Sequence, residues 1–221
     1  MNLSTIDLYE LVKRNLGTVV YKGSEGIMLR ETDNGTIMTD IDNVEKILAL
    51  TDNLKLAPMI TVKNHDTANA LAKVKHFESV YPCSQWVYTS TVAPEFDDCD
   101  IRILPENLVE YAAKHYSHES NPKEYFYERH SKECLFGIFE NGNLAGFIGI
   151  HREGSMGMLE ILPEYRKKGY AAKLESFLIG YQLKKGQTPF GHVVDGNLPS
   201  VSLQLKLGLE EAEKPIIWLC N

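Results

Sequence analysis

The segment from Met156 to Lys185 constrains the fold of this chain more than any other part of the sequence. It begins with an apolar, strand-like run, Met156–Leu162, and continues through a basic turn that contains Gly169. In Ala171–Lys185, apolar residues recur every three or four positions, which predicts a helix. The first N–H groups of a helix have no intrahelical partner and carry partial positive charge. The turn adds three cations, Arg166, Lys167 and Lys168. The segment therefore predicts a site for a phosphorylated ligand, which Gly169 would allow to approach the backbone closely.

The spacing of the glycines narrows the class of phosphorylated ligand that the turn can bind. The turn matches neither the Walker nucleotide loop nor the dinucleotide fingerprint. Arg166, Gly169 and Ala171 fit the pattern R/Q-x-x-G-x-G/A, which resembles the pyrophosphate-binding signature of the GNAT acyltransferase superfamily. Downstream, Asn197 to Ser200 resembles its Asn-x-x-Ser element, and residues 206–209 resemble its Lys-Leu-Gly-Phe element, with leucine in place of phenylalanine. The resemblance implies an α/β (α+β) GNAT fold, with a mixed, mostly antiparallel sheet flanked by helices.

Within the superfamily, the second half of the chain looks most like the glycine N-acyltransferase and FR47-like branch. The similarity lies in the Leu-Pro-Glu-Tyr-Arg turn, in Gly191–Asp195 with Asn197, and in Trp218–Asn221. It covers residues 133–221 well and the first half only loosely. It implies an N-acyltransferase that takes an acetyl or small acyl group from acetyl-CoA or another acyl-CoA. The acceptor would be a primary amine of a small molecule or amino acid, which attacks the thioester directly.

Composition sets outer bounds on the function. The 221 residues are 43% hydrophobic and 24% charged, which is typical of a folded globular protein. The net charge of −7 argues against nucleic acid as a partner. No apolar run is long enough for a membrane span, and Met1–Asp7 lacks the features of a signal peptide, so we expect a cytoplasmic protein that needs no membrane. The cysteines form no C-x-x-C pair, and no metal is expected. A homodimer is left open.

Two domains are expected, because the acidic segment 91–99 lacks periodicity and contains Pro94. Residues 1–96 would form an N-terminal α/β domain of unclear role, with a degenerate GNAT-like half as one alternative. Residues 97–221 would form the acyl-CoA-binding catalytic domain. The predicted helices are 5–14, 42–50, 66–74, 106–114, 122–130, 171–185 and 200–207. The predicted strands are 18–21, 26–29, 36–38, 59–62, 79–89, 101–104, 135–139, 144–150, 156–162, 190–194 and 216–219.

The resemblance also implies where the donor lies. Its pyrophosphate would rest on the amides of Lys167, Lys168, Gly169, Tyr170 and Ala171, next to Arg166. Its pantetheine arm would run between the strands 158–162 and 190–194. The N–H of Ile161 or Leu162 would polarise the thioester carbonyl. Asn197 is expected either to contact the donor or to cap the following helix, with Ser200 as the rival cap.

The reaction needs a proton acceptor, and two carboxylates are candidates. Glu160 is an ionisable residue inside an apolar strand, where alternation turns it away from Leu159 and Ile161, and it is the first choice. Alternatively, it pairs with a lysine or binds the ammonium of the acceptor. Glu153, in the preceding turn, is the second choice. His192 lies inside a strand and is expected to be a hydrogen-bonded core residue rather than a catalyst.

The expected proton donor for the leaving sulfur is missing. Many members of the superfamily have a tyrosine that protonates the coenzyme A thiolate, and this chain has Gln204 at the matching position. Two other functions stay open, and the missing tyrosine bears on the first of them. One is a catalytically silent acyl-CoA sensor with a GNAT fold, and the other is an unrelated nucleotide-binding regulator.

Overall fold

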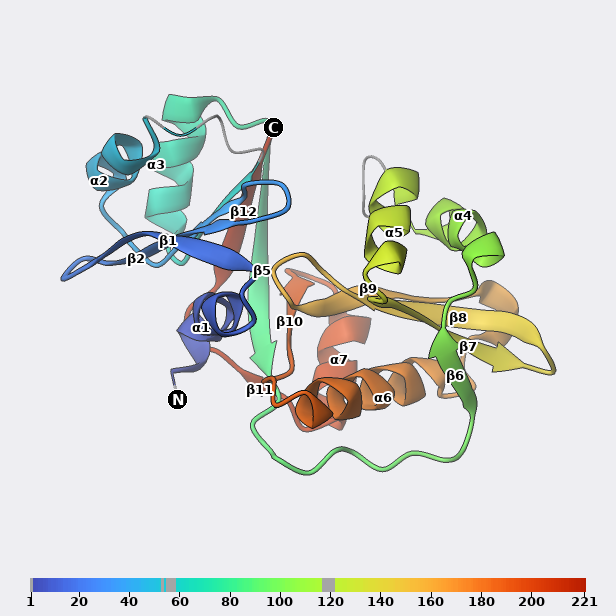
Figure 1. The fold of residues 1–221 in the computed structure, drawn as a ribbon. Coiled ribbons are helices and arrows are strands. Elements are labelled where there is room, and N and C mark those ends of the chain that lie inside the picture. The colour runs from blue at the N-terminus through green and yellow to red at the C-terminus, as the bar shows by residue number, and fades with distance from the viewer. Residues whose placement is uncertain (1, 53, 55–58, 117–121) are drawn as a thin grey trace.

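The computed structural model describes residues 2–52, 54, 59–116 and 122–221, and these form one long mixed sheet with helices on both faces (Figure 1). The strand order is β1-β2-β3-β4-β12-β5-β10-β9-β8-β7-β6, and the short strand β11 pairs with β5. All neighbours are antiparallel except β3–β4 and β9–β10. The expected α/β fold with a mostly antiparallel sheet is confirmed.

The elements agree closely with those expected from the sequence. The strands are β1 Gly17–Gly23, β2 Gly26–Glu31, β3 Ile37–Thr39, β4 Met59–Val62, β5 Ser79–Val87, β6 Asp100–Ile103, β7 Leu135–Glu140, β8 Asn143–Ile150, β9 Met156–Ile161, β10 Phe190–Val194, β11 Glu210–Glu211 and β12 Ile216–Cys220. The helices are α1 Ile6–Lys13, α2 Val44–Thr51, α3 His65–Lys75, α4 Glu106–His115, α5 Pro122–Ser131, α6 Tyr170–Lys184 and α7 Leu198–Lys206. Strand β11 and two 3₁₀ turns, η1 Leu3–Thr5 and η2 Pro163–Tyr165, were not expected.

The two halves of the sequence exchange strands at the centre of the sheet. The last strand, β12, lies between β4 and β5, so it completes the part of the sheet formed by the first half. Strand β5 belongs to the first half, yet residues 83–87 pair with β10 of the second half. The boundary between residues 1–96 and 97–221 stays a prediction, and the sheet runs continuously across it.

Separate apolar clusters fix the helices on the two faces near β9 and β10. On one face, Leu174 and Leu178 of α6 pack against Leu159 and Val193. On the other face, α4 and α5 pack against residues that include Phe147, Met158 and Leu162. Helix α1 packs through Leu8 and Leu11 against a cluster that includes Cys83 and Ile216, and Figure 1 shows it beside β5. The strands that bracket the expected donor site are therefore held from both sides.

Candidate functional site

The strands β9 and β10 separate soon after they meet. Among the described residues, their parallel pairing is confined to Gly191 and Met156. An extra residue in β9 causes a bulge, since Phe147 faces Glu160 whereas Gly149 faces Gly157. Met158 within the bulge has φ of 55°, a left-handed conformation that is uncommon for a residue with a side chain. The bulge follows the paired Met156, and among the described residues no later residue of β9 pairs with β10; this unpaired stretch between the two strands is called the gap.

One edge of β9 faces this gap with its backbone groups. The N–H of Leu162 donates to the carbonyl of Ala145 on β8, at 3.0 Å. Because backbone groups alternate in direction along a strand, the N–H of Ile161 points the opposite way, toward the gap. Of the two N–H groups expected to polarise a carbonyl, the one on Leu162 is therefore engaged in the sheet, and the one on Ile161 faces the gap.

The anion cradle predicted at residues 166–171 lies at the open end of the gap. Lys167 and Gly169 both have positive φ, 63° and 81°, which turns the chain sharply into α6. Gly169 is the N-cap residue, and no side chain caps the helix. A Cβ at Gly169 would meet no atom within 4 Å, so there is room for a ligand against this backbone. The first turn of α6, with Tyr170 and Ala171, can therefore offer free N–H groups to a phosphate.

The cations of the cradle already contact carboxylates. Arg166 Nη2 lies 3.1 Å from Glu160 Oε1, and its Nε donates to the carbonyl of Ile161 at 3.0 Å. Lys168 Nζ lies 2.9 Å from Glu140 Oε2. The hydroxyl of Tyr170 donates to Glu140 as well, and this bond raises the pKa of Tyr170 to about 12. Both ion pairs are exposed and therefore weak, so an incoming phosphate can replace the carboxylates.

Glu160, the first choice for the base, lies beside the cradle with a cationic partner. Its side chain is 23% exposed and pairs with Arg166 at the cradle. The alternative of a cationic partner therefore describes its surroundings, with an arginine in place of the expected lysine. Glu160 follows Met156 by four residues, which places it about 13 Å along the strand from the closed end of the gap.

Glu153, the second choice, lies at that closed end. Its carboxylate is almost fully buried and accepts a hydrogen bond from Ser155, the residue before Met156. His192, the residue after Gly191, places its Nδ1 4.0 Å from Glu153 Oε1. The only pairing position of β9 and β10 among the described residues is thus flanked by a buried carboxylate and a buried imidazole.

A chain of buried polar residues from the first half reaches His192. Nε2 of His192 lies 3.1 Å from Gln85 Oε1, and Lys63 Nζ lies 3.3 Å from the same oxygen. Lys63 donates to Asp7 Oδ2 at 2.7 Å, and both side chains are completely buried. Sequence reasoning missed Asp7, Lys63 and Gln85. The available signal was a lysine directly after the apolar strand 59–62 and a glutamine inside the strand 79–89.

Comparisons with known proteins agree with this geometry. Residues 135–219, which span the gap, the cradle and both splayed strands, match the family described as FR47-like protein. This match supports the resemblance of the second half of the chain to the FR47-like branch. No curated protein matches the chain significantly.

Solved structures place the whole chain in the GNAT fold. A protein from Drosophila melanogaster is 14% identical with a TM-score of 0.69, covering 100% of this chain and 90% of its own. A GNAT-family protein from Novosphingobium aromaticivorans is 17% identical with a TM-score of 0.62, over 98% and 97% of the two chains. A tandem GNAT protein from the clavulanic acid biosynthesis pathway is 11% identical with a TM-score of 0.50, over 96% and 86%.

In this GNAT fold, Gln204 contacts a buried acid rather than standing alone. Its Nε2 donates to Glu175 Oε1 at 2.7 Å, which links α7 to α6. Burial raises the pKa of Glu175 to about 7, against which the bond from Gln204 acts only in part. Gln204 Oε1 is buried with no hydrogen-bond partner among the described residues. The position of the expected tyrosine is therefore occupied by an amide beside a carboxyl group that is half protonated near neutral pH.

Asn197 has the capping geometry that was one of its two expected roles. Its Oδ1 accepts from the N–H of Ser200 at 3.2 Å, at the start of α7. Ser200 thus receives the cap rather than providing it. Contact of Asn197 or Ser200 with the donor stays a prediction.

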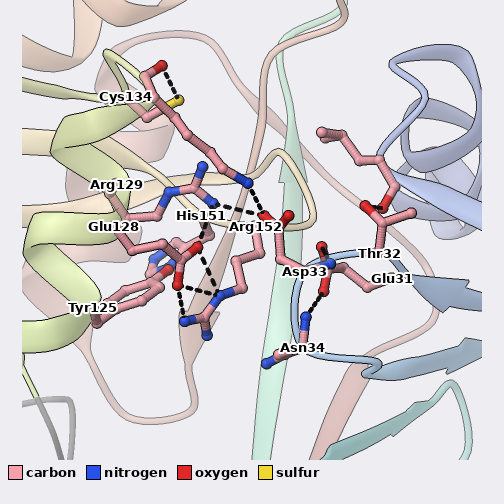
Figure 2. A network of polar contacts seen from close by, with 12 residues as sticks. Glu31, Thr32, Asp33, Asn34, Tyr125, Glu128, Arg129, Cys134, His151 and Arg152 are labelled. Carbon is pink, nitrogen blue, oxygen red and sulfur yellow. Dashed lines mark hydrogen bonds and ion pairs between the residues drawn. The ribbon is translucent and has the colours of Figure 1, made fainter.

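A second polar network joins the halves of the chain near His151 (Figure 2). Asp33, in the loop between β2 and β3, accepts from Lys132 at 2.5 Å and lies 3.8 Å from Arg129 Nη1. Arg152 pairs with Glu128 on α5, and Tyr125 Oη lies 2.6 Å from His151 Nδ1. Arg129 and Lys132 thus tie α5 and the residue after it directly to the β2–β3 loop.

Two features bear on other classes of function. In the part of the chain that the structure describes, no helix is long and apolar enough to cross a membrane. The same residues contain no group of three or more histidine, cysteine, aspartate or glutamate side chains that could hold a metal ion.

Proposed function

We propose that this protein is an acyl-CoA-dependent N-acyltransferase, which transfers an acetyl or small acyl group to a primary amine of a small molecule or amino acid. One observation carries the proposal. A gap between β9 and β10 begins at an anion cradle and ends at a buried carboxylate and imidazole. The FR47-like match over residues 135–219 supports the same reading.

The residues of the gap fit an acyl-CoA donor. The N–H groups of Lys167 to Ala171, together with Arg166 and Lys168, would hold its pyrophosphate. The pantetheine arm would follow the gap away from the cradle. The N–H of Ile161 faces this path close to the cradle, so it can donate to the pantetheine arm before the arm reaches the closed end.

The chemistry then requires one proton acceptor at the closed end. As the amine nitrogen bonds to the thioester carbon, the C–S bond breaks and its electron pair leaves with sulfur. The nitrogen loses one proton, and the thiolate gains one, from solvent or from a nearby acid. We assign the acceptor role to Glu153, because Glu160 lies back at the cradle and is paired with Arg166. Glu160 stays the second candidate.

We also propose that residues 1–96 are a degenerate GNAT-like half. A tandem GNAT protein resembles the chain over 96% of its length, which supports this origin. Between β3 and α2, where a phosphate cradle would be expected, the first half has the acidic residues Asp40 and Asp42. The donor would therefore bind to the second half alone. We further expect a cytoplasmic protein with small-molecule acceptors, no nucleic-acid partner and no membrane.

The test is the release of free thiol from a panel of acyl-CoA donors, with and without pooled amino acids and polyamines. Gly169→Trp should abolish the activity, because the indole would fill the cradle. Gly186→Trp is the matched control, since Gly186 lies just beyond α6, has a similar φ of 68° and also has open space around it. Arg166→Ala should weaken donor binding, whereas Lys184→Ala in the last turn of the same helix should not.

The outcomes separate the remaining alternatives. Acceptor-dependent thiol release that Gly169→Trp abolishes and Gly186→Trp retains would support the transferase. Binding of acetyl-CoA without thiol release in the presence of any acceptor would favour a sensor. Stronger competition by ATP than by coenzyme A would favour a nucleotide-binding regulator.

A further inference from the structure

We propose that His192 and Glu153 form the binding site for the attacking amine, and that the first half of the chain keeps His192 in the one tautomer that can serve there. This inference rests on the proposed function. In the proposed site, Nδ1 of His192 accepts a hydrogen bond from one N–H of the amine, and Oε1 of Glu153 accepts one from the other N–H. Both acceptors then direct the nitrogen lone pair into the gap.

The orientation of Gln85 determines the tautomer. Its Nε2 donates to the carbonyl of Leu3, at 2.5 Å, so its oxygen must face His192 and Lys63. That oxygen can only accept, so Nε2 of His192 must carry the proton that it donates. Nδ1 is then left with a lone pair, on the side of the ring that faces Glu153.

The chain behind Gln85 holds it in place. Lys63 occupies the second lone pair of the Gln85 oxygen, and Asp7 neutralises Lys63. All three side chains are buried, so water does not compete for their hydrogen bonds. Each of the three comes from the first half of the sequence, and none of them touches the gap directly. They are therefore positioning residues.

The two groups at the closed end are both acceptors. Glu153 Oε1 already accepts from Ser155, and it faces His192 Nδ1 across 4.0 Å with no hydrogen bond between the two atoms. The charge of Glu153 is partly offset by the guanidinium of Arg14. A donor between the two acceptors would satisfy both, and a primary amine offers two N–H groups. The side chain of His192 is 7% exposed and that of Glu153 is 9% exposed, so an amine bound between them would be almost fully desolvated.

His192 stays neutral in this setting. Its pKa is lowered to about 3, chiefly by burial and to a smaller extent by Lys63 and His151, whereas Glu153 opposes the shift. The imidazole therefore orients the amine and does not keep its proton. The proton that nitrogen loses when the C–N bond forms goes to the Glu153 carboxylate.

Nitrogen-15 NMR of the free protein tests the tautomer without any assay of activity. We expect His192 to show a protonated Nε2 and an unprotonated Nδ1 from about pH 8 to pH 5. Addition of methylamine should shift the Nδ1 resonance of His192, and should leave that of the exposed His65 unchanged. A protonated Nδ1, or a His192 resonance that ignores methylamine, would overturn the proposal.

Kinetics test the same site through a matched pair of variants. Asparagine can place an oxygen where Nδ1 lies, so His192→Asn should keep kcat/KM for the amine within a few-fold. His192→Leu has no hydrogen-bond acceptor and should lower kcat/KM for the amine at least tenfold, while the affinity for acyl-CoA stays unchanged. Gln85→Glu should lower it as well and should raise the pKa of His192 in the NMR titration. Equal activity of the asparagine and leucine variants would refute the assignment.

The two proposals fail in distinguishable ways. A response of His192 to methylamine without any thiol release would remove the transferase and keep the amine site. Thiol release with an unresponsive His192 would keep the transferase and remove the site.

Discussion

Glu175→Gln should stabilise the protein at alkaline pH and leave it nearly unchanged at acidic pH. Glu175 is buried on α6, and its partner is the Nε2 of Gln204. Burial raises the pKa of the carboxyl group from 4.5 to about 7. Each tenfold change in proton affinity is worth about 1.4 kcal/mol, so the full effect is about 3 kcal/mol.

The direction follows from the proton balance. Since the folded protein holds this proton more tightly than the unfolded chain, the stability that the group contributes is complete below pH 4.5. It is lost as the pH rises through about 7. Glutamine resembles the protonated carboxyl group and still accepts from Gln204, so the variant avoids this loss.

Denaturant unfolding at two pH values measures the effect. At pH 8 the variant should exceed the wild type by about 3 kcal/mol, and at about pH 5 by less than about 1 kcal/mol. The exposed Glu211→Gln serves as the control and should show no such difference. An equal gain at both pH values, or none at pH 8, would refute a neutral buried carboxyl group.

Three further predictions concern the buried chain, the helix cap and the choice of base. Lys63→Met should lower the free energy of unfolding by about 3–5 kcal/mol, because it leaves Asp7 charged and buried. The double variant with Asp7→Asn should recover most of this loss. Additive losses of the two single variants in urea titrations would contradict a coupled pair. Asn197→Ala should lower the free energy of unfolding by about 1 kcal/mol, whereas Asn197→Asp should keep the helix cap and the stability. If the aspartate variant binds coenzyme A more weakly in calorimetry, Asn197 also contacts the acyl donor. Glu160→Gln should change kcat by less than about threefold and Glu153→Gln should lower it by about a hundredfold or more in the thiol-release assay, and the reverse order would return the base role to Glu160.

Local structure could be predicted from the sequence because its signals are local. The boundaries of β10 match the prediction, and α6 begins one residue earlier than expected, at Tyr170. Both elements combine regular apolar spacing with a glycine or proline at their ends. The cradle followed from the same kind of signal, since Gly169 and its basic neighbours lie within a few residues of each other.

The arrangement of the closed end could not be predicted in this way. Gln85 and His192 meet only because β5 pairs with β10, and no spacing in the sequence indicates a pairing between strands so far apart. The pairing of Glu160 with Arg166 could not be predicted for a related reason. Its position in an apolar strand was correctly read, but the chain turns sharply after Leu162 and brings Arg166 back to it. Local sequence patterns predict which way a side chain points, and they do not predict which residues distant in the sequence become its neighbours in the fold.

The exchange of β12 into the first half has a consequence during synthesis on the ribosome. Strands β4 and β5 emerge early, and the position between them stays empty until β12 has been made. In the meantime, both strands expose unpaired edges, which are templates for aggregation. The first half should therefore depend on chaperones while the second is translated. When residues 1–96 are expressed alone, they should be insoluble, and a peptide of β12 supplied in trans should rescue them.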